Sequence, residues 1–197
     1  MKCIGGALLT AGEARLWHGK RSWTQFGTLN ELRLQLLTEP GISELDWEDF
    51  GRGAEPVKKI MLCAALTALD VPGINWSNCT VIGWNGDGCR RENVRYFADY
   101  LDSGRSGGRG SLFVPTLPSI PFCEAAIMLK CHGGGTYFST AASTRQLAGL
   151  LPLNGEKMCL IGEITANWSA LVLCENSSDS EFDDAANLQE FFRRNSR

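Results

Sequence analysis

Apolar residues recur along this chain at two spacings, one typical of strands and one typical of helices. A short apolar run over residues 3–9 predicts a first strand. Residues 57–69 place apolar side chains at helical spacing directly after Pro56, and proline is favoured in the first turn of a helix. Further strands are predicted over residues 79–84, 136–139, 158–163 and 169–174, and further helices over residues 29–37, 93–101, 120–130 and 143–151. Strands that alternate with helices predict an α/β fold, with a mainly parallel sheet flanked by helices.

The sequence also predicts the conformation of two connections and of the C-terminal part. The prolines of residues 112–118 predict an extended segment, because the residue before a proline is pushed away from helical backbone. The joint over residues 164–168 is long enough for a hairpin between the last two strands. Residues 176–197 are acidic and then weakly amphipathic, through Leu188, Phe191 and Phe192. We therefore expect one domain over residues 1–175, followed by a tail over residues 176–197.

Composition narrows the class of protein. With 197 residues, 44% hydrophobic and 21% charged, the chain fits one globular domain. A net charge of −3 gives no indication of a nucleic-acid groove. No apolar run is long enough to span a membrane, and the N-terminus lacks a signal-peptide pattern, so we expect a cytoplasmic protein. Five arginines within residues 90–109 would suit an acidic partner, although a solvated loop is the commoner reason for such a segment.

The cysteines and histidines predict no metal or cofactor. The eight cysteines form no C-x-x-C pair, and the only histidines are His18 and His132. Cys79 and Cys131 are interpreted as buried structural thiols rather than nucleophiles. The glycines of residues 83–88 and 133–135 have the wrong offsets, or the wrong following element, for a nucleotide-binding loop. Tight turns account for both segments.

Residues 137–147, Tyr-Phe-Ser-Thr-Ala-Ala-Ser-Thr-Arg-Gln-Leu, resemble the strand-to-helix elbow of the β-ketoacyl synthases. Residues 57–69, 80–84 and 112–119 resemble, in the same order, a helix, a strand and a loop that precede this elbow in the family. The resemblance spans roughly residues 1–175. It implies a truncated ketosynthase-like N-terminal domain, which is half of a thiolase-like fold.

The resemblance also implies that catalysis is lost. The family carries its nucleophilic cysteine where Ala142 stands, and a methyl group cannot form a thioester. The family takes its two active-site histidines from a second half, and neither His18 nor His132 lies in a matching context. We expect no catalytic residue, with Ala142 as the vacated nucleophile position.

Two segments are implied to meet a partner. In ketosynthases the strand before the elbow pairs with its twin across the dimer axis, and the matching residues are Thr136, Tyr137, Phe138 and Ser139. The loop Phe113, Val114, Pro115 corresponds to residues that help line the partner's acyl tunnel, although Phe113 is also compatible with an ordinary core position. The predicted helix after the elbow would need a partner or the tail to cover Leu147, Leu150 and Leu151.

Three functions remain open from the sequence. The first is a non-catalytic protein resembling a chain-length factor, which pairs with a complete ketosynthase of fatty-acid or polyketide biosynthesis and shapes its acyl pocket or its contact with acyl carrier protein. The second is a stand-alone homodimer that binds acyl chains or acyl carrier protein. The third is a decarboxylase of malonyl thioesters, which needs oxyanion donors but no cysteine.

Overall fold

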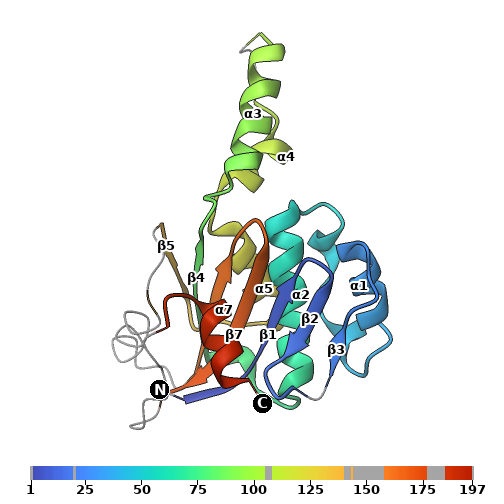
Figure 1. Ribbon diagram of the computed structural model, residues 1–197. Helices are drawn as coiled ribbons and strands as arrows, with labels where there is room; N and C mark the ends of the chain where they lie inside the picture. The colour runs from blue at the N-terminus through green and yellow to red at the C-terminus, as the bar shows by residue number, and fades with distance from the viewer. Residues whose placement is uncertain are drawn as a thin grey trace.

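A single seven-stranded sheet organises the computed structural model, which describes residues 2–19, 21–104, 108–139, 143, 158–176 and 185–196 (Figure 1). The strands follow the spatial order β3-β2-β1-β7-β6-β4-β5. Their bounds are β1 Lys2–Thr10, β2 Glu13–Leu16, β3 Ser22–Trp23, β4 Cys79–Asn85, β5 Gly135–Phe138, β6 Met158–Ile164 and β7 Trp168–Glu175. The α/β class expected from the sequence is confirmed.

The pairing within the sheet is mixed rather than mainly parallel. Only β4 with β5 and β4 with β6 pair in parallel, and the other four pairs are antiparallel. Two of the antiparallel pairs are joined by tight connections, because strands joined by a short turn must run in opposite directions. One is the predicted hairpin between β6 and β7, closed by Thr165 N–H donating to the Trp168 carbonyl at 2.8 Å. The other joins β1 to β2 through Gly12, whose φ of 88° suits glycine.

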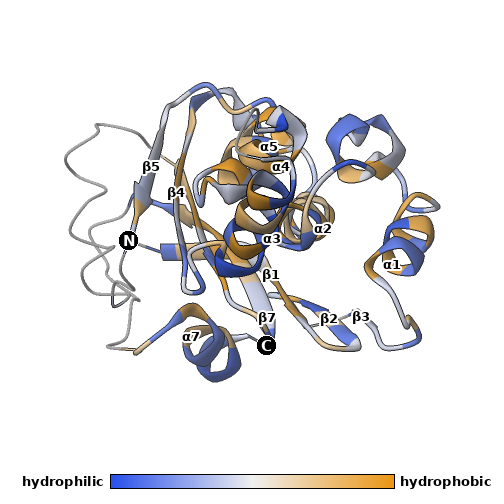
Figure 2. Cartoon of the chain, turned by 90° about the horizontal axis from the view of Figure 1, so that it is seen from above, coloured by the Kyte–Doolittle hydropathy of each residue, from blue (hydrophilic) through white to orange (hydrophobic). Residues whose placement is uncertain are grey.

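Helices α2 (Glu55–Asp70) and α5 (Ile120–Leu129) cover one face of the sheet, with α1 (Leu29–Leu36) beside α2 (Figure 2). Pro56 lies in the first turn of α2, as predicted. Two short 3₁₀ turns lie between α1 and α2, at η1 Ile42–Glu44 and η2 Glu48–Phe50, and a third, η3 Trp76–Asn78, lies between α2 and β4. Gly83 and Gly162 lie opposite each other in β4 and β6, and a Cβ on either would come within 2.6 Å of the Phe122 ring. The paired glycines therefore let α5 pack closely on the sheet.

Helix α7 (Leu188–Asn195) covers the opposite face of the sheet (Figure 2). Leu188, Phe191 and Phe192 are all buried there, and the Phe191 ring stacks on Trp17 with centroids 5.3 Å apart. Burial of three large apolar side chains explains why this short helix is held in place. The segment expected to be a tail thus contributes an element of the packed core.

The connection from β4 to α5 forms an arm that extends beyond the sheet (Figure 1). It consists of α3 (Arg90–Asp102), α4 (Gly110–Phe113) and the turn η4 (Val114–Thr116). The prediction of an extended segment over residues 112–118 was wrong for residues 112–116, because Pro115 occupies the first turn of η4, where its missing N–H costs nothing. Phe113 also packs edge-on against Tyr96 of α3 at 5.6 Å, which holds the turn against that helix.

Candidate functional site

Strand β5 forms one edge of the sheet. It pairs in parallel with β4, from Val81 opposite Gly135 to Trp84 opposite Phe138, and it is last in the strand order. Within the described part of the chain, no strand pairs with its other side. Thr136 is exposed, whereas the side chains of Tyr137 and Phe138 are half-buried. This edge offers main-chain donors and acceptors to a further strand.

The side chains of β5 anchor the strand from both faces of the sheet. Tyr137 lies on the α5 side, with its ring centroid 6.4 Å from that of Phe122, and burial raises the pKa of Tyr137. Phe138 packs on the other side, against the cluster that holds α7. A strand anchored in this way presents its outer main-chain groups in a fixed geometry.

The arm carries an unusual concentration of exposed apolar side chains. Among the described residues, eight large hydrophobic side chains are exposed, and six of them belong to the arm or to the residue after it: Val94, Phe97, Leu101, Phe113, Val114 and Leu117. Val94, Phe97 and Leu101 follow the spacing of one helix face and are 63%, 61% and 53% exposed. Phe113 is 47% exposed, so it is no ordinary core aromatic. Val94, Phe97 and Leu101 thus form an exposed apolar stripe on α3, and a stripe of this kind is a candidate interaction surface.

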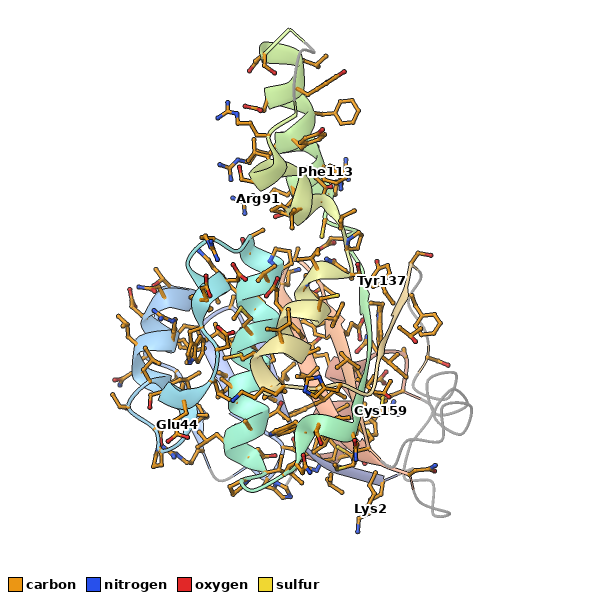
Figure 3. The ribbon with its side chains drawn as sticks, turned by 180° about the vertical axis from the view of Figure 1, so that it is seen from behind. Lys2, Glu44, Arg91, Phe113, Tyr137 and Cys159 are labelled. Carbon is orange, nitrogen blue, oxygen red and sulfur yellow. The ribbon has the colours of Figure 1, made fainter. Side chains whose placement is uncertain are left out.

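The edge strand and the arm lie at the same end of the sheet. Helix α3 follows β4 after a short turn, and β5 runs beside β4 in the same direction. Figure 3 shows Tyr137 below the base of the arm and Phe113 on the arm itself. Residues 136–139 and 113–115, two of the segments that the sequence singled out, therefore both lie toward this end of the sheet.

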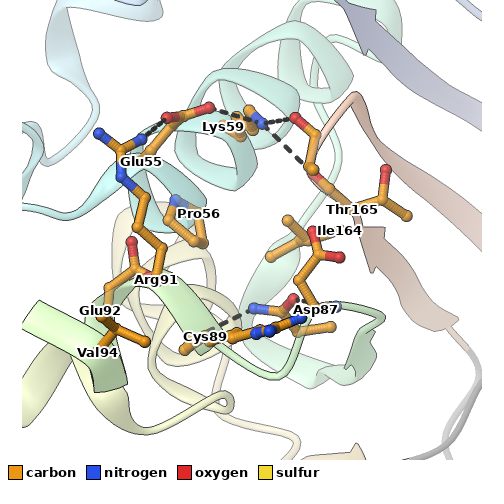
Figure 4. A pocket seen from close by; sticks show the side chains of 13 residues that line it. Glu55, Pro56, Lys59, Asp87, Cys89, Arg91, Glu92, Val94, Ile164 and Thr165 are labelled. Atoms are coloured by element: carbon orange, nitrogen blue, oxygen red, sulfur yellow. Dashed lines mark hydrogen bonds and ion pairs between the residues drawn. The ribbon is translucent and has the colours of Figure 1, made fainter.

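An ion-pair network ties the base of the arm to the core (Figure 4). Glu55, at the start of α2, pairs with Lys59 at 2.8 Å and with Arg91 of α3 at 2.9 Å. Lys59 Nζ also donates to the carbonyls of Ala166 at 2.6 Å and Thr165 at 3.3 Å, in the β6–β7 turn. The hydrogen bond from Lys59 is the main reason that the pKa of Glu55 is lowered. The network thus links α2, α3 and the hairpin.

The network residues Glu55, Lys59 and Arg91 line a cavity of about 490 Å³ at the carboxyl ends of β4 and β6. Its wall includes Cys89, which has a left-handed backbone with φ of 55° and accepts a hydrogen bond from Asn85 Nδ2 at 3.2 Å. Burial raises the pKa of Cys89 to about 11. The thiol is therefore protonated at neutral pH, which disfavours it as a nucleophile.

A second cavity, of about 640 Å³, carries positive charge between α2 and the arm. Arg52, Lys58, Arg91 and Arg95 line it together with two carboxylates, and Ala54 leaves the N-terminus of α2 without a side-chain cap. Cations beside an open helix N-terminus favour anionic ligands. Arg91 and Arg95 belong to the arginine-rich segment noted in the sequence.

Several sequence-derived candidates fall elsewhere. Ala142, together with Leu147, Leu150 and Leu151, lies outside the described residues. His18 pairs with Asp70 at 3.1 Å, far along the chain from the arm. Among the described residues, no group of three or more His, Cys, Asp or Glu side chains is placed to hold a metal ion.

Sequence reasoning missed two parts of the site. The ion-pair network joins residues 36 positions apart, Glu55 and Arg91, and leaves no local signal. The spacing of Val94, Phe97 and Leu101 was visible, but the same spacing is expected of a helix that faces its own core.

The described helices include no single one long and apolar enough to cross a membrane, although α4 with η4 and α5 pass that test together as a bent pair.

The architecture is that of an α/β protein, with a sheet that carries helices on both faces and an arm after β4. No family model matches the sequence, and neither does any curated protein. Solved structures match in fold. A chain from the complex of a ketosynthase with its chain length factor, from Xenorhabdus doucetiae, superposes with a TM-score of 0.56 at 11% identity, over 96% of this chain and 88% of that one.

Two further structures agree. A β-ketoacyl synthase from Burkholderia phymatum STM815 has a TM-score of 0.55 at 11% identity, over 89% of this chain and 58% of the other. The ishigamide ketosynthase/chain length factor has a TM-score of 0.54 at 11% identity, with coverages of 92% and 63%. The chain thus spans about three fifths of these two proteins and most of the first. The ketosynthase-like fold predicted from the sequence is confirmed.

Proposed function

We propose that this protein is a non-catalytic, chain-length-factor-like partner of a complete ketosynthase in polyketide-type or fatty-acid-type biosynthesis. The observation that carries the proposal is the exposed apolar stripe of the arm, Val94, Phe97 and Leu101, at the same end of the sheet as the open edge strand β5. Ala142 supports the non-catalytic role, because alanine cannot form the acyl thioester.

The arm supports a protein partner rather than a small ligand. Its exposed side chains are aromatic and aliphatic, lie on a helix and its adjoining turn, and extend over residues 94–117. Interfaces are built around such apolar anchors, with a polar rim around them. The cations at the base of the arm, among them Arg91 and Arg95, suit the rim.

Strand β5 supports pairing by strand addition. Its outer edge is open in the described chain, and a second edge strand would extend the sheet through main-chain hydrogen bonds. Phe113, Val114 and Pro115 lie on the arm, and in such a complex they shape the partner's acyl pocket.

The comparisons support a ketosynthase as the partner. Two matched structures are described as a ketosynthase with its chain length factor, and in the first the matched chain is covered over 88% of its length. A further match, with a TM-score of 0.50, is described as a type II polyketide synthase acyl-carrier protein in complex with its ketosynthase. The positively charged cavity between α2 and the arm suits the phosphate-linked arm of such a carrier.

Co-expression with the ketosynthase encoded nearest to this gene tests the proposal. Size-exclusion chromatography with light scattering should show one complex that contains both chains. Separate elution at micromolar concentration would contradict the proposal, and a stable dimer of this chain alone would favour the homodimer instead. Release of carbon dioxide from a malonyl thioester by the isolated chain would favour a decarboxylase.

A pair of proline variants tests the role of β5. Successive residues of a strand direct their N–H groups to opposite neighbours, so one of Thr136 and Tyr137 donates outward. The register, with Val81 N–H donating to the Gly134 carbonyl, turns Thr136 N–H toward β4 and Tyr137 N–H outward. Tyr137→Pro should therefore abolish the complex, whereas the matched Tyr137→Ala, which loses the same ring but keeps the N–H, should still form it. Thr136→Pro should lower stability, because it removes a bond to β4. Undiminished complex formation by both proline variants would exclude strand pairing.

A further inference from the structure

The cavity of about 490 Å³ at the base of the arm lies where the parallel strands β4 and β6 end. The chain leaves β4 after Asn85 toward the arm, and it leaves β6 after Ile164 into the hairpin with β7. The start of α2 forms the third wall, through Glu55, Pro56 and Lys59. Open α/β sheets bind their ligands outside the carboxyl ends of the strands, where neighbouring connections leave in different directions. The cavity therefore has the position of a ligand site.

The buried polar side chains of the wall are already bonded within the protein. Asn85, which is 3% exposed, donates from Nδ2 to Cys89 Sγ at 3.2 Å, and its Oδ1 accepts from Asp87 N–H at 3.2 Å. Lys59 is 9% exposed, and its Nζ pairs with Glu55 and donates to two carbonyls of the β6–β7 turn. A polar group that entered the cavity would lose its water without finding a free buried partner, which is unfavourable.

The charges around the cavity cancel. Its charged side chains are three cations and three carboxylates, namely Lys59, Arg90, Arg91, Glu55, Asp87 and Glu92. The wall therefore has no net formal charge and gives no preference to an ion of either sign. Apolar side chains complete the wall, namely Pro56, Val94, Ile164 and Ala166.

We propose that this cavity binds an uncharged small molecule with an apolar body. The volume lies within the range of small-molecule sites, roughly 300–1,000 Å³. Figure 4 shows Glu55 and Lys59 across the cavity from Asp87 and Cys89, with the space between them open to such a ligand. The proposal does not depend on the proposed function, because it rests on the walls of the cavity alone.

A ligand in the cavity connects the arm to the core. Val94 of the arm lies across the cavity from Thr165 of the hairpin turn (Figure 4). The ion pair between Glu55 and Arg91 spans the same two parts of the molecule, but the Arg91 side chain is 81% exposed, and exposed ion pairs contribute little to stability. A bound apolar body adds contacts to α2, α3 and the hairpin at once. Its binding should therefore slow hydrogen exchange in the first two turns of α3.

Titration of the full-length protein with N-phenyl-1-naphthylamine, an uncharged fluorescent probe, tests the proposal. We expect saturable binding of one probe per chain. The uncharged 1-naphthalenemethanol should displace the probe. The matched cation 1-naphthylmethylamine and the matched anion 1-naphthoate should compete at least about tenfold more weakly, because neither charge finds a free partner in the cavity. Absence of saturable binding, or equal competition by the charged compounds, would overturn the proposal.

Two variants show whether the probe lies in this cavity. Ala166→Phe fills it from the hairpin turn, and Val94→Trp fills it from the arm. Both positions are exposed, so both variants should fold, and each should weaken binding of the probe at least about tenfold. The matched Ala98→Phe adds the same ring at an exposed position of α3 that does not line the cavity, and it should bind like the wild type. Wild-type affinity in both filling variants would overturn the assignment.

Hydrogen exchange read by mass spectrometry tests the contact with the arm. Saturating N-phenyl-1-naphthylamine should slow exchange in the first two turns of α3 in the wild type and in Ala98→Phe, but not in Ala166→Phe. Unchanged exchange in the probe-saturated wild type would show that the ligand does not connect the arm to the core.

Discussion

Replacing Glu163 with glutamine should stabilise the protein at neutral and alkaline pH. The Glu163 side chain lies on β6 and is only 4% exposed, and its Oε2 accepts a hydrogen bond from Leu188 N–H at 2.8 Å. Burial raises the pKa of Glu163 from 4.5 to about 7, because an ionised carboxylate is poorly solvated beneath α7. Glutamine keeps an oxygen that can accept from Leu188 and removes the charge.

The size of the expected stabilisation follows from the raised pKa of Glu163. Between pH 4.5 and about 7 the folded state holds a proton that the unfolded state has released, so the free energy of unfolding falls as the pH rises through this window. The difference of about 2.5 pH units corresponds to about 3 kcal/mol at 1.36 kcal/mol per unit. Below pH 4.5 the carboxyl is protonated in both states, and this penalty disappears.

Urea unfolding followed by tryptophan fluorescence at pH 5 and pH 8.5 measures the effect. Glu163→Gln should exceed the wild type in free energy of unfolding by about 3 kcal/mol at pH 8.5 and by much less at pH 5. The difference between the two pH profiles isolates Glu163, because all other titrating groups are shared. A variant that is no more stable than the wild type at pH 8.5, or equally stabilised at both pH values, would refute the reasoning.

Two further substitutions test the packing on the two faces of the sheet. Gly83→Ala should lower the free energy of unfolding by about 1–3 kcal/mol, because its Cβ would come within 2.5 Å of the Phe122 ring. The loss should be smaller in a Phe122→Leu background, and equal losses in both backgrounds, measured by urea unfolding, would contradict that account. Phe191→Ala should lower the free energy of unfolding by about 3–5 kcal/mol, because the Phe191 ring is 1% exposed and stacks on Trp17. A loss of less than about 1 kcal/mol, measured by thermal or urea unfolding, would show that this contact does not hold α7 in place.

Local spacing predicted most of the elements. Residues 57–69 and 120–130 correspond to α2 and α5, because one helix face and its flanking prolines are both visible in a short window. The hairpin between β6 and β7 was predicted from the length of its joint. Strands β2 and β3 were missed because four and two residues carry too little periodicity to be seen.

Interactions between distant residues account for the rest. The helical turn at residues 110–116 depends on Phe113 packing against Tyr96, which no local rule for proline includes. The exposed stripe of α3 has the pattern of a buried one, and only the fold shows that the helix extends away from the sheet.

A matched pair of leucine variants tests the central claim most directly. Leu101 on the arm and Leu34 on α1 are both 53% exposed, so Leu101→Ser and Leu34→Ser remove the same side chain from equally exposed positions. Binding of each variant to the ketosynthase partner is measured by titration calorimetry. The account predicts that Leu101→Ser weakens binding at least about tenfold, or 1.4 kcal/mol, while Leu34→Ser binds like the wild type. Equal affinities of the two variants would contradict the claim that the apolar face of the arm binds the partner.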